Sequence, residues 1–414
     1  MSSPDVVSDN PFRLPAFRLF FGTRLMAVLG AQVQGLTIGI QVYELARDRG
    51  NDIKTSAFYL GMIGLAQFLP MFLLVLPAGV VADQRDRKTI FAVCLFVDAV
   101  IAALYVALSL HGAPPLWMLC VLAALFGASR AFIAPASSAT LPMLVPREAL
   151  PRAIVLNSLA FQSSAIVGPA VAGVIYAISP TVAYASALAL FLLGAVISLM
   201  IPGNTRPEPS ATSRWELMKE GLRYVWRTKI VFGAISLDLF AVLLGGATLL
   251  MPAFARDVLH VGPQGVGLMR GAGGVGASAM ALYLAFKPIR RHGGLWMFAG
   301  VAVFGLATVV FGISKLFWLT LVALAIIGAS DMISVNVRQT LIQIVTPDAM
   351  RGRVSAVSML FISASNELGE FESGVVARFL GPVGAAVFGG VGSLIVTGAW
   401  AAMFPSLRKA DRLT

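Results

Sequence analysis

Charged residues are scarce in this sequence. Asp, Glu, Lys and Arg make up 12% of its 414 residues, whereas they make up about a quarter of an ordinary soluble domain. Hydrophobic residues make up 58%, and the mean hydropathy is +0.84. This balance excludes a typical soluble globular domain and predicts a protein embedded in a lipid bilayer.

Cysteine and histidine are also rare. The two cysteines, Cys94 and Cys120, lie in hydrophobic segments and show no pairing pattern, so we expect them to be packing residues. The three histidines, His111, His260 and His292, are scattered among loops. Such scattered residues do not predict a metal site, and we expect no cofactor.

Nucleotide-binding motifs are missing as well. No Walker loop is present, so we do not expect ATP to drive the protein directly. The glycine-rich run at 271–276 lies inside a hydrophobic segment with no strand before it, which indicates close helix packing. The net charge of +11 could indicate a nucleic-acid partner, but the basic residues fall in loops on alternate sides of the hydrophobic segments. We therefore expect neither an enzyme nor a nucleic-acid binder.

Long hydrophobic segments dominate the chain. Each has about twenty residues or more, enough to cross roughly 30 Å of hydrocarbon. Because lipid tolerates only helices or closed barrels, and barrel strands would be short and alternating, the segments predict an all-α membrane protein. The twelve predicted transmembrane helices are 18–43, 57–82, 88–110, 116–141, 153–178, 181–201, 230–255, 264–287, 295–314, 316–344, 353–378 and 382–404.

The distribution of basic residues predicts the orientation. Most of the 31 Lys and Arg lie in the N-terminal segment, in alternate loops, in the central loop and in the C-terminal tail. By the positive-inside rule, both termini are expected to be cytoplasmic. The first residues, 1–15, are polar and lack the apolar core of a cleavable signal, so we expect the first helix to serve as its own insertion signal.

The longest break between hydrophobic segments divides the chain near its middle. It begins with several prolines and continues as Trp215–Trp226, where Trp and Leu alternate with charge, as in a helix lying on the inner membrane surface. We therefore predict an N-terminal half (1–201), a cytoplasmic linker (202–229) and a C-terminal half (230–414).

An internal repeat supports this division. Gly127-Ala-Ser-Arg130 aligns with Gly328-Ala-Ser-Asp331, and in the same register Gly168 meets Gly369. A similar alignment of the first helices places Arg24 opposite Asp238. The repeat predicts two pseudo-symmetric halves of six helices each, with a substrate site between them.

A short charged loop joins the second and third predicted helices. Its sequence, Gly79-Val-Val-Ala-Asp83-Gln-Arg85-Asp-Arg87-Lys88, resembles the signature loop of the major facilitator superfamily, although Gln84 stands where Arg or Lys is frequent. The resemblance implies a gate in which Asp83 faces the start of the eleventh helix, near Arg351 and Arg353. Alternatively, Arg87 and Lys88 only anchor the helices at the inner surface.

Two further phrases resemble one branch of that superfamily. They are Leu250-Met-Pro-Ala-Phe-Ala-Arg-Asp257 and Gln343-Ile-Val-Thr-Pro-Asp-Ala-Met-Arg-Gly-Arg353, and they are similar to those of bacterial enterobactin exporters and related efflux proteins. The resemblance implies a monomeric transporter of a small molecule in the bacterial inner membrane. In the fifth helix, Gly168, Pro169 and Gly173 resemble an antiporter motif of exporters, or else provide ordinary small-residue packing.

Charged residues inside the predicted helices are the candidate transport residues. The repeat pairs Arg24 with Asp238 and Arg130 with Asp331, and the resemblance places their four helices around the central cavity. Charges in a membrane usually pair or face water. We therefore expect Arg24 and Asp238 to form a latch between the halves, and Arg130 and Asp331 to lie near a substrate or proton site. Static ion pairs are the alternative.

Acidic residues in the eleventh helix are further candidates. Glu367 and Glu370 share a helix face, and together with Asp331 they are candidate proton-coupling residues, with Arg338 and Arg270 as possible static partners. Asp98, in the third helix, is expected only to pack. The sequence thus predicts proton-coupled efflux of a small amphipathic compound, a drug or a siderophore-like molecule. A lipid flippase of the same fold and a non-transporting scaffold or sensor remain alternatives.

Overall fold

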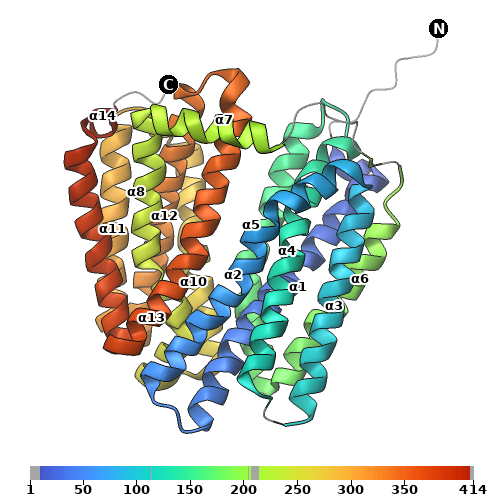
Figure 1. The fold of residues 1–414 in the computed structure, drawn as a ribbon, viewed down its shortest axis with the longest axis vertical. Helices are drawn as coiled ribbons and strands as arrows, with labels where there is room; N and C mark the ends of the chain where they lie inside the picture. Colours follow the sequence, from blue (N-terminus) through green and yellow to red (C-terminus); the bar gives the residue numbers. More distant parts are fainter. Residues whose placement is uncertain (1–9, 113, 204, 207–213, 411–414) are drawn as a thin grey trace. The chain divides into compact units, whose positions relative to one another are not determined.

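The computed structural model describes residues 10–112, 114–203, 205–206 and 214–410, which form helices and no strand (Figure 1). Short 3-10 helices, η1 (Pro11–Arg13) and η2 (Ala247–Leu250), and a π-helix, η3 (Phe254–Val258), accompany the α-helices. The α-helices are α1 (Pro15–Asp48), α2 (Ile53–Gln84), α3 (Arg87–Leu110), α4 (Leu116–Leu144), α5 (Leu150–Ile178), α6 (Pro180–Leu199), α7 (Arg214–Arg227), α8 (Lys229–Gly245), α9 (Met251–Ala253), α10 (Gly262–Phe286), α11 (Gly293–Ile313), α12 (Phe317–Val345), α13 (Asp348–Met403) and α14 (Pro405–Arg408).

The chain forms two compact units. The first unit comprises residues 1–37 and 69–211, and α3 packs against both α4 and α6 within it. Its core contains Tyr105 and Tyr184, whose rings stack with 4.6 Å between their centroids. The Tyr105 hydroxyl donates to the carbonyl oxygen of Leu119 at 3.0 Å. This bond satisfies the hydroxyl inside a core where water cannot do so.

The second unit comprises residues 38–68 and 212–414, with α8 and α11 packed against α13, and α10 and α11 against α12. The backbones of α10 and α12 approach closely. A Cβ atom at Gly276 would collide with the Ala325 carbonyl, and one at Gly328 would collide with the Gly273 carbonyl. Small residues allow such approach between membrane helices, so the predicted packing role of the run at 271–276 is confirmed.

Residues 38–68, which belong to the predicted first half, are grouped with the second unit. The helices α1 and α2 therefore each contain residues of both units. The predicted amphipathic segment of the linker forms α7. The division of the chain at 202–229 stays a prediction.

The predicted membrane segments fall in helical parts of the chain. Ten helices among the described residues are long and apolar enough to cross a membrane. One of them, α13, contains the predicted segments 353–378 and 382–404, and α10, which is not among the ten, covers 264–287. The all-α membrane class is confirmed, while the count of twelve crossings stays a prediction.

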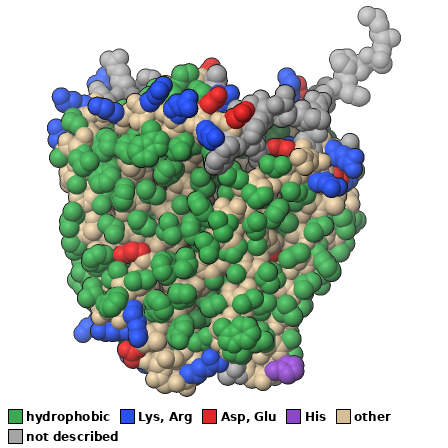
Figure 2. Space-filling model, in the orientation of Figure 1, with side chains coloured by type: hydrophobic (Ala, Val, Ile, Leu, Met, Phe, Trp, Pro, Cys, Tyr) green, Lys and Arg blue, Asp and Glu red, His purple; other side chains and the backbone are tan. Residues whose placement is uncertain are grey.

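The helix surfaces are those of a membrane protein. Large apolar side chains are exposed along them, among them Phe96 (57% exposed) and Trp318 (77%). Figure 2 shows hydrophobic side chains over the helix flanks, with most Lys and Arg near the helix ends. Within the helices, hydroxyl groups often donate to the carbonyl four residues earlier, as Thr140 does to Ala136 at 2.7 Å. Polar side chains are satisfied in this way without water.

The long helix α13 contains one sharp break. Gly381 has φ 77° and ψ 169°, a backbone conformation that is essentially restricted to glycine. Pro382 follows directly and starts the second arm without needing a hydrogen-bonded amide. The two arms of α13 are thus joined without a loop.

We expect Gly381→Ala to lower the free energy of unfolding by about 1–3 kcal/mol, because alanine cannot adopt this conformation without strain. The loss would come from backbone strain and not from a steric clash, because a Cβ atom at this position would have only Lys54 Cε nearby, at 4.0 Å. Unfolding of the full chain in detergent measures the effect. The control is Gly398→Ala on the same helix, where a Cβ atom has no neighbour within 4 Å. Equal losses in the two variants would contradict this account.

Candidate functional site

A buried ion pair joins α8 to α12. The Arg338 guanidinium contacts the Asp238 carboxylate, and their side chains are only 1% and 6% exposed. None of the three guanidinium nitrogens of Arg338 has an aligned hydrogen-bond partner within the described residues, so the contact is mainly one of charge. Removing such a pair from water is expensive and is compensated only when both partners are present. The pair therefore fixes how α8 lies against α12.

Asp331 extends this pair into a three-residue cluster. It precedes Arg338 by two turns on α12, which places both side chains on one face of the helix. Asp331 interacts electrostatically with both Asp238 and Arg338. Two carboxylates thus share one guanidinium, and a single proton could neutralise the surplus negative charge.

The predicted arginines of the first unit lie in separate places. Arg24, on α1, lies 5.8 Å from the ring centroid of Phe161, and its buried Nε atom has no hydrogen-bond partner among the described residues. Arg130, on α4, lies 6.0 Å from the Phe126 ring centroid. Cations over aromatic faces are stabilised by the ring quadrupole. The latch between Arg24 and Asp238 stays a prediction.

Asp98, which the sequence predicts only to pack, is 1% exposed on α3. The Ser129 hydroxyl of α4 donates to the Cys94 carbonyl at 3.2 Å, and the positive charge of Arg130 acts on the Asp98 carboxylate. The first unit therefore places an acid near one of the two candidate arginines. The sequence alone could have indicated that Asp98 lies near a partner, because a buried Asp in a membrane helix requires one.

The acids of α13 differ in their surroundings. Glu370 forms an ion pair with Arg270 of α10, with 3.9 Å between Oε1 and the guanidinium nitrogen. This is one of the static partnerships that the sequence left open. Glu367 is half-buried on the same helix, and Glu372 accepts a long bond of 3.5 Å from Ser373. The part of Glu367 and Glu370 in proton coupling stays a prediction.

The charged loop is as tight as predicted. Only Arg85 and Asp86 separate α2 from α3, and Gly79 is buried. Asp83 lies 3.8 Å from Arg87, one turn further on. Arg87 also donates to the carbonyl oxygen of Ala139 on α4 at 2.8 Å.

Lys88 ties the same loop to the end of α6. Its ammonium donates to the carbonyl oxygens of Ile201 (3.0 Å) and Gly203 (2.8 Å). The backbone amide of Lys88 donates to the Thr205 hydroxyl at 3.1 Å. Arg87 and Lys88 therefore bind backbone carbonyls of their own unit, which is more than an anchor at the membrane surface requires.

The predicted counterpart of the gate lies at the start of α13. Arg351 pairs with Asp348 at 2.7 Å and donates to the Gln343 carbonyl at 3.0 Å. Arg353 pairs with Glu220 of α7. The contact of Asp83 with this segment stays a prediction.

The antiporter-like motif lies in the interior of its unit. Gly168, Pro169 and Gly173 are buried on α5, which continues through the proline. A Cβ atom at Gly168 would lie 2.7 Å from Gln32 Cβ on α1. The motif therefore permits close packing of α5 on α1, the simpler of the two interpretations, and a part in export stays a prediction.

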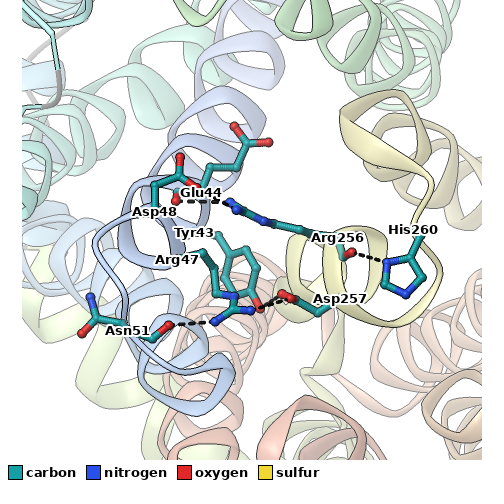
Figure 3. Close-up of polar contacts among 8 residues, drawn as sticks. All are labelled: Tyr43, Glu44, Arg47, Asp48, Asn51, Arg256, Asp257 and His260. Carbon is teal, nitrogen blue, oxygen red and sulfur yellow. Dashed lines mark hydrogen bonds and ion pairs between the residues drawn. The ribbon is translucent and has the colours of Figure 1, made fainter.

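A second polar cluster, which was not predicted from the sequence, joins the end of α1 to the π-helix η3 (Figure 3). Asp257 accepts from the Tyr43 hydroxyl and from Arg47, the latter at 2.9 Å. Arg256 pairs with Asp48 at 2.7 Å and donates to the Glu44 carbonyl at 3.2 Å. Two adjacent residues of η3 thus bind successive turns of α1. We call these residues the α1–η3 cluster.

The backbone of this region is also unusual. Single-turn π-helices often occur at functional sites, and η3 is followed by His260 with φ 54°, a conformation uncommon outside glycine. The His260 ring bonds the Arg256 carbonyl at 2.9 Å. A cavity of about 310 Å³ lies beside the cluster, lined in part by Ile40, Tyr43 and Val266. The only sequence signal was the phrase ending in Arg256-Asp257.

We expect Arg338→Met to lower the free energy of unfolding by about 3–5 kcal/mol, because it leaves the buried Asp238 carboxylate without its cation. Adding Asp238→Leu should restore part of the loss. Arg351→Met is the control, since both side chains of its ion pair are exposed and such pairs contribute about 1 kcal/mol or less. Similar losses for Arg338→Met and Arg351→Met in detergent unfolding would contradict the importance of the buried pair.

Comparison with known proteins places these features in context. A family model described as "Transmembrane secretion effector" matches residues 7–413. The enterobactin exporter EntS of Citrobacter koseri is 24% identical over 389 residues, which cover 92% of this chain and 90% of that protein. EntS of Shigella boydii matches with the same identity and coverage.

Solved structures show the same fold. A POT family transporter in complex with 5-aminolevulinic acid superposes with a TM-score of 0.71 at 12% identity, over 95% of this chain and 97% of that one. A bacterial homologue of the lysosomal transporter Spinster, in an inward-facing and unoccupied conformation, superposes with a TM-score of 0.70 at 12% identity, over 95% of this chain and 96% of that one. The nucleoside transporter NupG superposes with a TM-score of 0.69 at 13% identity, over 93% of this chain and 99% of that one.

Proposed function

Because the chain belongs to the transmembrane secretion effector family of major facilitator transporters, we propose that it exports a small amphipathic compound in exchange for protons. That it is a multi-pass membrane transporter of a small molecule, and not an enzyme, follows from the family itself. The direction of transport, the coupling ion and the substrate class are our proposals.

The proposed direction and substrate class rest on the relatives. The matching proteins from Citrobacter koseri and Shigella boydii are named enterobactin exporters, and the match extends along nearly the whole chain. A siderophore or a drug of mixed polarity fits this likeness. The antiporter-like residues of α5, Gly168, Pro169 and Gly173, also favour export.

The proposed proton coupling rests on one observation, the cluster of Asp238, Asp331 and Arg338. Its two acids share a single buried base, so the cluster can hold either a surplus negative charge or one added proton. Intramembrane acids of this kind form proton relays in transporters. Asp331 is the better candidate for the proton, because Asp238 holds the direct ion pair and Asp331 is less buried.

The proposed transport cycle is a rocking of one half against the other. Because α1 and α2 are continuous helices, a rocking motion that carries residues 38–68 with the first unit would break the α1–η3 cluster. We propose that this cluster closes the outer side and opens during the cycle. The proposal also includes cytoplasmic termini, a location in the bacterial inner membrane and a monomeric state.

Flux measurements in proteoliposomes test the proposal directly. With wild-type protein we expect an imposed proton gradient to drive movement of a siderophore or drug, and Asp331→Asn to abolish this gradient dependence, because an amide cannot carry the proton. Glu148→Gln, at an exposed acid, is the matched control. Undiminished gradient-driven flux in Asp331→Asn would exclude Asp331 as the coupling residue. Gradient-independent flux would overturn antiport, and flux of lipids alone would favour a flippase.

We expect Asp257→Asn to expose the cavity beside the α1–η3 cluster. Loss of hydrogen bonds to a charged group costs about 1.5–3 kcal/mol, enough to raise the open population about ten-fold or more. The readout is the rate at which a membrane-impermeant maleimide labels Ala255→Cys in a chain lacking Cys94 and Cys120; Ala255 is 1% exposed and lines the cavity.

The matched control for that experiment is Asp48→Asn. Asp48 belongs to the same cluster, but its side chain is 62% exposed, and exposed pairs contribute about 1 kcal/mol or less. Its labelling rate should therefore change little. If neither variant alters labelling, the cluster does not close this side of the protein.

A further inference from the structure

The helix α7 is fixed to its unit by one side. Val225 is 1% exposed, and a Cβ atom at Gly221 would lie 2.8 Å from the carbonyl oxygen of Arg353. The Tyr224 hydroxyl donates to the Val345 carbonyl at 3.0 Å. Glu220 adds an ion pair with Arg353. The helix therefore rests on the end of α12 and on the start of α13.

The opposite side of α7 is exposed and has two chemically different strips. Leu222 (37% exposed) and Trp226 (60% exposed) form an apolar strip one turn apart. Next to it, Arg223 and Arg227 form an exposed basic strip, also one turn apart. Lys219 continues the basic strip toward the N-terminus, and Glu216 is the exposed acid of the first turn.

The position of α7 suits the boundary of a bilayer. Figure 1 shows it lying across the helix ends of its unit, roughly perpendicular to them. The Trp226 ring stacks on Phe232 near the start of α8, with 4.7 Å between centroids. Tryptophan is enriched at the level of the headgroups. An apolar strip beside a basic strip, on a helix in this position, matches acyl chains beside phosphate groups.

We propose that the exposed side of α7 binds anionic phospholipids, with Arg223 and Arg227 on the headgroup phosphate and with Leu222 and Trp226 in the acyl region. A zwitterionic lipid offers no net charge to the basic strip, so anionic lipid is preferred. Each such basic residue strengthens binding to an anionic surface about five-fold.

Lipid binding on the exposed side of α7 would affect the contacts that its packed side makes with α13. The same helix holds Arg353 through Glu220 and contacts its backbone through Gly221. A lipid that fixes α7 at the bilayer surface therefore restrains the start of α13, the segment predicted to take part in the inner gate. The transport rate then depends on the anionic lipid content. This consequence rests on the proposed function, whereas the lipid binding does not.

Quenching of Trp226 tests the binding. The full-length protein is placed in nanodiscs containing brominated phosphatidylglycerol or brominated phosphatidylcholine, and the contribution of Trp226 among the six tryptophans is obtained by difference from Trp226→Phe. We expect quenching at a lower fraction of phosphatidylglycerol than of phosphatidylcholine. Arg223→Gln with Arg227→Gln should remove this preference, a loss of about 25-fold.

The control is Arg290→Gln with Arg291→Gln, an exposed basic pair elsewhere in the same unit, which should leave the quenching of Trp226 unchanged. Equal quenching by the two lipids, or a preference that survives the Arg223 and Arg227 substitutions, would overturn the proposal. Relief of quenching by soluble glycerol phosphate would assign the strip to free phosphate instead.

Flux in liposomes separates this inference from the proposed function. With anionic lipid present, transport should be faster for the wild type than for the Arg223→Gln, Arg227→Gln variant. If Trp226 shows the lipid preference but no compound moves, the binding proposal stands and the transport proposal fails. Equal flux with and without phosphatidylglycerol would refute the link from α7 to α13.

Discussion

The high cost of an unpaired charge in lipid governs the arrangement of this protein. Inside the second unit, that cost is met by the contact of Asp238 with Arg338, and the two helices that carry these residues must lie together for it to form. The same rule explains why Arg24 and Arg130 lie over aromatic rings and why Arg270 lies near Glu370. Packing between the apolar surfaces alone would leave many helix arrangements nearly equivalent, since lipid is as apolar as the side chains.

The loop between α2 and α3 and the α1–η3 cluster use different chemistry to hold their segments. At the loop between α2 and α3, Arg87 and Lys88 bind carbonyl oxygens of neighbouring helix ends. Those acceptors belong to the backbone, so the loop is fixed as long as the helices are. In the α1–η3 cluster, side chain meets side chain, as in the pairs of Asp257 with Arg47 and of Asp48 with Arg256. These contacts between side chains can be replaced by contacts with water without unfolding a helix.

Much of the fold could be predicted from the sequence, because hydrophobic length and loop composition are local properties. The helical segments, the short charged loop after α2, the amphipathic α7 and the packing role of the glycines at 271–276 all follow from patterns within about thirty residues. The boundary between the arms of α13 was signalled by Gly381-Pro382. The π-helix carried no comparable pattern, since one extra residue in a turn leaves the hydrophobic period almost unchanged.

The partners of the buried charges could not be predicted in the same way. The internal repeat suggested matching Asp238 with Arg24, because the two occupy equivalent positions in the chain. In the structure Asp238 contacts Arg338, a pairing between α8 and α12 that the repeat does not indicate, while the latch with Arg24 stays a prediction. Asp98, which was expected only to pack, is buried within the influence of the Arg130 charge. Symmetry identifies equivalent positions, whereas contacts depend on how each unit packs.

The break at Gly381 has a consequence for how the chain enters the membrane during synthesis. The two arms of α13 are joined at a single glycine. No polar loop lies between them that could remain in water after the first arm has inserted. Without such a loop, the two arms of α13 are expected to enter the bilayer together as a helical hairpin. The last two predicted crossings would then insert as one unit.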